Sequence, residues 1–296
     1  MHLAWIKEPI EILGAGLEVW EERKKIRDMG VRAIKTLLGG RKHVAVFGIA
    51  GTGKTTLGEL LTGKLDPWST EPLKYVESPK KEIPDKEEGT VPLRVWVAPG
   101  QARSSAKEGM AKTTGGIELL QMLDKVGQGD FDVIVNVVSW GYAAFHPAKL
   151  SSVSGYEHDA TVPMSVEQTN AKHLSSYVSQ CRDAEVTALE RVVAKCHSTK
   201  PERLLFLTVV AKADLWWEQR DQVQKHYNAV CSAAFKGLAA DRGQRFESRM
   251  LAASLVRTNL RDKDGQVLAE TARGYDDWRH LQQLHDLFHE FETALS

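Results

Sequence analysis

Short apolar runs alternate along this chain with longer stretches in which apolar residues recur every three or four positions. The apolar runs predict strands at 43–47, 73–77, 91–98, 131–139, 204–210 and 249–256. The helical periodicity predicts helices at 54–63, 115–126, 166–197, 214–240 and 276–295. Continuous apolar strands separated by helices are typical of a mostly parallel sheet covered on both faces. We therefore predict an α/β fold, a three-layer sandwich around a sheet of six strands.

One pair of strands departs from this alternation. The runs at 73–77 and 91–98 follow one another without a helix between them. A connection without a crossover helix favours antiparallel pairing, so we expect one antiparallel edge strand. The loops at 64–72, 78–90 and 141–165 are longer than ordinary connections and are candidates for functional segments.

The N-terminal segment predicts a separate helical extension. Its apolar residues share one helical face: Leu3, Ile6, Ile10, Leu13, Leu17 and Trp20. We expect residues 1–40 to form this extension and residues 41–296 to form the main domain, with an insertion at about 141–168 and a closing C-terminal helix. The extension either packs on its own domain or binds a partner protein or a membrane surface.

Composition narrows the function classes. The 296 residues include 39 Lys and Arg against 39 Asp and Glu, so net charge gives no signal for nucleic-acid binding. The cysteines form no C-x-x-C pair and have no metal-ligand spacing with histidine, which favours a reducing compartment and a cytoplasmic location. Charged residues interrupt the apolar positions near the N-terminus, so we predict no transmembrane segment.

The strongest motif is a phosphate-binding loop. Residues 48–55, GIAGTGKT, fit G-x-x-x-x-G-K-[ST] between a predicted strand and a predicted helix. Glycines let successive N–H groups point at phosphate oxygens, and the helix adds its positive N-terminal end. Lys54 is predicted to neutralise phosphate charge, and the Thr55 hydroxyl to bind Mg²⁺. The predicted nucleotide-binding residues of this segment are Gly48, Gly51, Thr52, Gly53, Lys54, Thr55 and Thr56.

A second motif bears on the base. Strand 204–210 runs into AKAD, residues 211–214, which resembles the N-K-x-D motif of the Ras-like and translation-factor-like GTPases. The resemblance implies that Asp214 accepts hydrogen bonds from guanine and that Lys212 lies along the base plane. Ala211 stands where the family has Asn. The alternative is an ordinary turn in which Asp214 caps the next helix.

A third motif bears on hydrolysis. Residues 97–101, VAPGQ, resemble the family's D-x-x-G-Q sensor of the γ-phosphate. The resemblance implies that the Gly100 N–H contacts this phosphate and that Gln101 orients the attacking water. Val97 replaces the family's Asp, which weakens the expected metal site. The alternative is a Pro-Gly turn followed by a surface glutamine.

Two further positions follow from the same resemblance. Thr70 lies where the family uses a threonine as a Mg²⁺ ligand in the first switch segment. The stretch 252–254, AAS, resembles the Ser-Ala loop that meets guanine O6, which implies a role for Ala253.

Three functions remain open at this point. The first is a guanine-nucleotide switch that binds GTP and GDP and hydrolyses GTP with Mg²⁺, with Gln101 and Lys54 as catalytic residues. The second is a hydrolysis-deficient GTP-binding scaffold. The third is an adenine-nucleotide ATPase, which is disfavoured because no acidic residue directly follows strands 131–139 or 204–210. We expect a protein partner at the switch loops or the N-terminal helix, and homodimerisation stays open.

Overall fold

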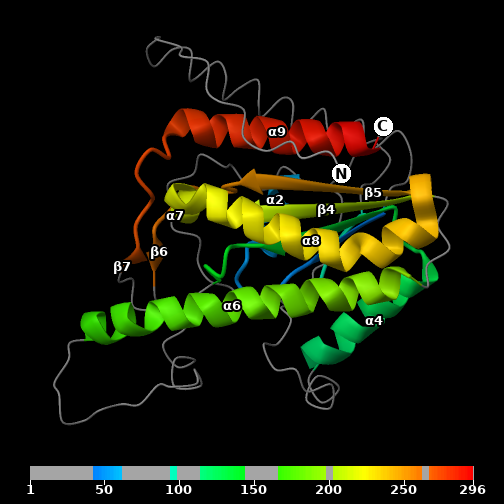
Figure 1. Cartoon of the computed structure of the whole chain (residues 1–296), viewed down its shortest axis with the longest axis horizontal. Coiled ribbons are helices and arrows are strands. Elements are labelled where there is room, and N and C mark those ends of the chain that lie inside the picture. The colour runs from blue at the N-terminus through cyan, green and yellow to red at the C-terminus, as the bar shows by residue number, and fades with distance from the viewer. Residues whose placement is uncertain are drawn as a thin grey trace.

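The computed structural model describes residues 43–61, 94–98, 114–143, 166–197, 203–261 and 267–295. These residues contain a sheet of five parallel strands in the order β2-β1-β3-β4-β5 (Figure 1). The strands are β1 (His43–Phe47), β2 (Arg94–Val97), β3 (Val133–Val138), β4 (Leu204–Ala211) and β5 (Phe246–Ala253). The predicted α/β fold with a parallel sheet is confirmed. The expected edge strand at 73–77 and the extension 1–40 lie outside the described residues, so a sixth strand stays a prediction.

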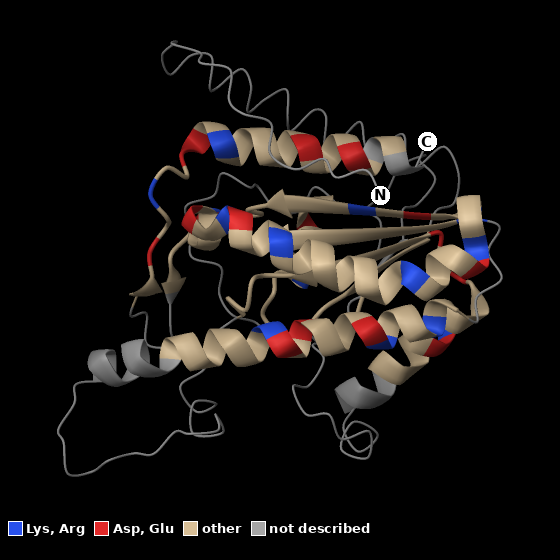
Figure 2. Cartoon of the chain, viewed as in Figure 1, with Lys and Arg blue, Asp and Glu red and all other residues tan. Residues whose placement is uncertain are grey.

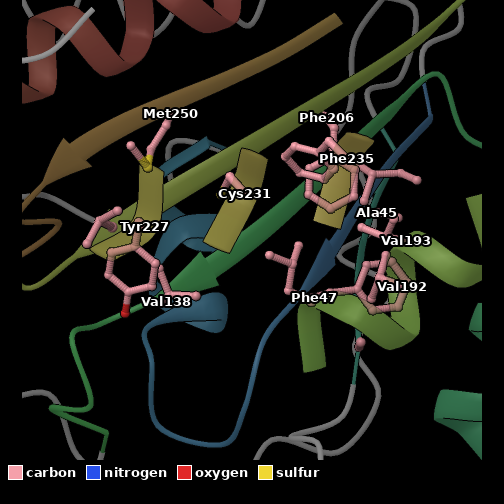
Figure 3. Packing of buried hydrophobic residues seen from close by; sticks show 14 of the residues in the cluster. Ala45, Phe47, Val138, Val192, Val193, Phe206, Tyr227, Cys231, Phe235 and Met250 are labelled. Carbon is pink, nitrogen blue, oxygen red and sulfur yellow. The ribbon is translucent and has the colours of Figure 1, made fainter. Parts of the chain in front are cut away.

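Helices cover both faces of the sheet. They are α2 (Lys54–Leu61), α4 (Thr114–Gln128), α6 (Val166–Cys196), α7 (Ala213–Trp216), α8 (Arg220–Arg242) and α9 (Asp277–Leu295). Side chains of α4, α6 and α8 pack on one face in a core that includes Phe47, Phe206 and Phe235 (Figure 3). Side chains of α2 and α9 pack on the opposite face. The three expected layers are therefore present.

The predicted helix at 214–240 is divided in two. α7 ends at Trp216, a 3-10 turn spans Trp217–Gln219, and α8 begins at Arg220. The Trp216 side chain is fully buried, and its indole N–H donates a hydrogen bond to the Ala211 carbonyl at 2.7 Å. This contact holds Trp216 against the end of β4. A contact of this kind leaves no mark in the apolar periodicity from which the helix was predicted.

A short hairpin was not predicted. β6 (Leu260–Arg261) pairs with β7 (Val267–Ala269) in an antiparallel arrangement apart from the main sheet. Strands of two and three residues are too short for an alternating pattern to be recognised. The β5 prediction was also shifted, because the strand begins at Phe246 and ends at Ala253 rather than at residue 256.

Charged residues within the described ranges lie mainly on the helices, at the strand ends and in the segment before α9 (Figure 2). β5 is an exception. Its Arg249 donates hydrogen bonds to Glu247 on the same strand, at 2.7 Å, and to Glu290 on α9. Arg203 donates to Glu247 as well, at 2.6 Å. These ion pairs link β5 to α9 at the side of the sheet.

Replacing Asn136 with leucine is expected to stabilise the protein. Asn136 lies in the middle of β3 with 0% exposure, and neither polar atom of its side chain has a hydrogen-bond partner among the described residues. Leucine has nearly the same shape and removes the cost of two buried unsatisfied groups. We expect the free energy of unfolding to rise by about 1–3 kcal/mol, measured by urea denaturation. A loss of stability would show that a buried water satisfies the amide.

Candidate functional site

The predicted site segments meet at one edge of the sheet. Because all five strands are parallel, the segments after their carboxyl ends lie on the same side (Figure 1). From β1 the chain runs to β2 on one side and then to β3 on the other. Ligands of open α/β sheets bind at such a reversal of strand order, and the phosphate loop begins directly after β1.

The backbone of the phosphate loop has the form that the motif requires. Its three glycines all have positive φ angles: 144° at Gly48, 82° at Gly51 and 106° at Gly53. At Gly48 a methyl group would also lie 2.3 Å from the Val137 carbonyl oxygen of β3 and 3.0 Å from the Thr52 hydroxyl. The absence of a side chain lets the loop turn tightly against β3, and this fits a cradle of N–H groups around an anion.

Lys54 is a buried cation at the start of α2. Its side chain is 6% exposed, and its Nζ donates a hydrogen bond to the Ile49 carbonyl at 2.7 Å. The buried Thr52 hydroxyl donates to the same carbonyl at 3.1 Å. Burial lowers the pKa of Lys54 to about 7. An anion in the loop would offset this loss of hydration, because a nearby negative charge favours the protonated lysine.

Oxygen ligands for a metal ion are sparse around this loop. Thr55 and Thr56 follow Lys54 in α2, and both are half-buried. Val97, at the position of the family's Asp, ends β2 beside Val46 and packs against the apolar core of that face. Within the described ranges no group of three or more His, Cys, Asp or Glu side chains can hold a metal ion. Thr55 is the predicted Mg²⁺ ligand that lies within the described residues, beside Lys54 in α2, and its role stays a prediction.

Asp214 is the buried acid of the site. It lies in α7 with 1% exposure, and its carboxylate accepts hydrogen bonds from the Ser254 hydroxyl and from the Thr258 N–H, the latter at 3.0 Å. Burial raises the pKa of Asp214, and these two donors oppose that shift. The alternative of Asp214 as a helix cap is wrong, because Lys212 occupies the cap position of α7 and makes no side-chain cap hydrogen bond.

Lys212 lies two residues before Asp214, and its side chain is held by one hydrogen bond. Its backbone is left-handed, with φ 58°, and its Nζ donates a hydrogen bond to the Tyr142 carbonyl after β3. Burial lowers the pKa of Lys212 to about 8, while the negative charges of Asp214 and Glu185 act in the opposite direction. The base motif is therefore tied to the segment that follows β3.

The base motif and the phosphate loop are adjacent. A methyl group at Gly53 would lie 3.4 Å from Cδ1 of Leu255 and 4.0 Å from Cβ of Ala211. Leu255 follows β5, and Ala211 ends β4. The sheet thus brings the two predicted motifs into one site, although Gly53 and Ala211 are 158 positions apart in the sequence.

The stability of the protein is expected to depend on pH through Lys212. Its pKa in the folded protein, about 8, is below the ordinary lysine value of 10.5. The folded state therefore releases this proton first, so the free energy of unfolding rises as pH increases from about 8 toward 10.5. We expect a gain of up to about 1 kcal/mol per pH unit relative to Lys212→Met, measured by urea denaturation at several pH values. Parallel pH profiles of the two proteins would contradict this assignment.

Several predicted site residues are not tested by the structure. Thr70, Gly100 and Gln101 lie outside the described residues, so their roles stay predictions. Ala253 is the last residue of β5, fully buried and in register with Ala211. The polar contact in this stretch comes from Ser254, the next residue, which was quoted in the motif but not assigned a role.

Sequence reasoning missed a buried acid, Glu185 of α6. Its carboxylate is 1% exposed and accepts hydrogen bonds from the Ser139 N–H at 2.7 Å and the Ser139 hydroxyl at 3.0 Å. The Tyr227 hydroxyl of α8 donates to its second oxygen at 2.5 Å and accepts the Trp140 N–H at 3.0 Å. These contacts hold the segment after β3 whose Tyr142 carbonyl binds Lys212. The only signal in the sequence was a Glu among apolar helix positions.

The described helices include none that is both long and apolar enough to cross a membrane.

Comparisons with known proteins give a likeness of overall structure. No known protein-family model matches the sequence, and no curated protein matches it. One similar solved structure is the small COPII coat GTPase SAR1 from Encephalitozoon cuniculi in complex with GDP, with 15% identity, a TM-score of 0.38, and coverage of 94% of this chain and 93% of that chain. A dimerization-deficient mutant of Toc33 from Arabidopsis thaliana has 11% identity, a TM-score of 0.37, and coverage of 94% and 92%.

A third similar structure is the signal recognition particle receptor SRb-GTP/SRX complex from Chaetomium thermophilum, with 11% identity and a TM-score of 0.30, covering 81% of this chain and 98% of that chain. All three TM-scores are below 0.5, so this likeness carries no functional assignment.

Proposed function

We propose that this chain binds guanine nucleotides and hydrolyses GTP to GDP with Mg²⁺. The observation that carries the proposal is the placement of a buried carboxylate, Asp214 of α7, three residues after Ala211, whose Cβ lies beside Gly53 of the phosphate loop. A phosphate cradle and an acceptor for base N–H groups at the same sheet edge are what a purine nucleotide requires. Guanine offers adjacent N1–H and amino donors to such a carboxylate, and adenine offers no matching pair.

The proposed roles of the residues at the phosphate end of the nucleotide are the following. Lys54 and the backbone N–H groups of 48–55 bind and orient the phosphates, and a protonated Lys54 offsets their charge. Thr55 is proposed to bind the Mg²⁺ ion, which supplies further charge neutralisation when bound. Gln101 is proposed to orient the attacking water. Binding of a protein partner at the switch loops, in the cytoplasm, is part of the same proposal.

Titration calorimetry with GDP and with ADP, both in Mg²⁺, tests the base assignment. We expect GDP to bind at least about tenfold more tightly than ADP, a difference of about 1.4 kcal/mol. Asp214→Asn removes one acceptor at nearly constant shape and is expected to abolish the preference. Asp221→Asn, an exposed position on α8, is the matched control and should keep it. Equal affinities of the unmodified protein for GDP and ADP would contradict guanine recognition.

A second candidate function is GTP binding without hydrolysis. Val97 supports it, because a partly buried apolar side chain that packs against the core stands where the family has the acid that holds Mg²⁺ through water. Single-turnover measurements of GTP conversion by the unmodified protein and by Gln101→Leu distinguish the two candidates. Turnover that Gln101→Leu removes supports hydrolysis, and binding with equally slow turnover in both supports the second candidate.

A further inference from the structure

Hydrogen bonds through Ser254 connect α7, which carries Asp214, to α9. Ser254 is fully buried after β5, and its hydroxyl donates to Oδ1 of Asp214. Its N–H donates to Oε1 of Gln283, a buried residue of α9, at 3.2 Å. A single residue, Ser254, therefore connects the amide of α9 with the carboxylate of the base motif.

The Gln283 amide is held in one orientation. The Tyr275 hydroxyl donates to the same Oε1 atom at 2.8 Å, so two donors specify which end of the amide is the oxygen. Tyr275 is itself buried and packs edge-on against Trp217, with ring centroids 5.5 Å apart. The Nε2 group of Gln283 has no hydrogen-bond partner among the described residues, although the side chain is only 7% exposed. The buried, unpaired Nε2 group lowers the stability of the protein. The same amide orientation places Oε1 where it accepts the Ser254 N–H.

Both oxygens of the Asp214 carboxylate are held by hydrogen-bond donors. Ser254 occupies one position on Oδ1, and the Thr258 N–H occupies one on Oδ2. Each carboxylate oxygen accepts two hydrogen bonds. Ser254 and Thr258, one on each oxygen, therefore set the plane in which the carboxylate can accept further hydrogen bonds. Guanine N1–H and its 2-amino group need such a plane at the same time.

We infer that Gln283, with Tyr275 acting through it, is a positioning residue for guanine recognition by Asp214. This inference rests on the proposed function. Gln283 fixes Ser254, Ser254 fixes the plane of the Asp214 carboxylate, and that plane allows both guanine donors to be bound together. α9 is in this way part of the base site, although it is not proposed to contact the nucleotide.

The test uses three diphosphates, GDP, ADP and inosine diphosphate, and the full chain. Inosine diphosphate lacks the 2-amino group, so the ratio of its dissociation constant to that of GDP reports the second hydrogen bond. Gln283→Met keeps the length of the side chain and removes the acceptor. We expect it to weaken GDP binding about tenfold and inosine diphosphate binding much less, so that the ratio falls toward 1. Gln282→Met, at the half-exposed neighbouring position of α9, is the matched control and should keep the original ratio.

Tyr275→Phe is the second variant, because it removes the hydroxyl that donates to Gln283 and lies near Ser254 while keeping the ring that packs on Trp217. It should lower the same ratio by a smaller factor, and it decides the question if Gln283→Met does not fold. If both variants weaken GDP and inosine diphosphate equally, Gln283 has only a structural role and the inference is overturned. If the unmodified protein binds ADP as tightly as GDP, the proposed function fails instead, and the two failures are distinguished in one set of titrations.

Discussion

Replacing Gly48 with alanine is expected to lower the free energy of unfolding by about 3 kcal/mol or more and to abolish measurable nucleotide binding. The added Cβ would lie 2.3 Å from the Val137 carbonyl oxygen, and the φ angle of 144° is one that side chains rarely adopt. The Val137 carbonyl belongs to the backbone of a central strand, so it cannot move aside without disturbing the sheet. The measurements are urea denaturation and GDP titration of the same preparation.

Gly274→Ala is the matched control for this prediction. Gly274 also has a positive φ angle, 77°, but nothing lies within 4 Å of an added Cβ. It therefore tests the conformational cost alone, which we expect to be about 1–2 kcal/mol. If Gly48→Ala and Gly274→Ala lose the same stability, close approach of the phosphate loop to β3 is not the reason for Gly48.

The Glu185→Leu variant is expected to lose about 3–5 kcal/mol of stability, because it leaves buried donors without acceptors. The Ser139 N–H, the Ser139 hydroxyl and the Tyr227 hydroxyl all donate to this carboxylate. Leucine fills a similar volume, so the loss reports hydrogen bonding rather than a cavity. Urea denaturation measures the effect.

Glu190→Leu provides the comparison for Glu185. Glu190 lies five positions later on α6 and is exposed, so its replacement should change stability by less than about 0.5 kcal/mol. A loss at position 185 as small as at position 190 would mean that the hydrogen bonds to Ser139 and Tyr227 are not maintained in solution.

The charge of Glu185 also affects the pKa of Lys212 in the base motif. The segment it holds includes Tyr142, whose carbonyl accepts a hydrogen bond from Lys212. Glu185→Gln removes one of the negative charges that raise the pKa of Lys212, so in a variant that still folds this pKa should fall further and the pH dependence assigned above to Lys212 should grow.

The strands were predictable because burial on both faces leaves a local mark. β3 and β4 are buried at every position, and their sequences, VIVNVV and LLFLTVVA, are almost continuously apolar. The phosphate loop was also predictable from local sequence, because its strand, its glycines and Lys54 are consecutive in the chain. Each of these features is specified within about ten residues.

The contacts that shape the base site are not local, and the sequence did not indicate them. Ser254 is 40 positions from Asp214, Gln283 is 29 positions from Ser254, and Ser139 is 46 positions from Glu185. Each pair depends on which strand ends and helices the sheet brings together. The break after Trp216 has the same origin, since a hydrogen bond to Ala211 and not a helix-breaking residue ends α7.

Concentrated solutions of this protein should resist strand-by-strand association at β5. β5 is the outermost strand of the described sheet on its side, and the open edge of such a strand is a template for pairing with another chain. Arg249 and Glu247 place charges on this strand, and Glu290 of α9 holds Arg249 in position. An incoming strand would have to remove water from these ions without offering them new partners. The ion pairs that link β5 to α9 thus favour solubility as well as the local packing.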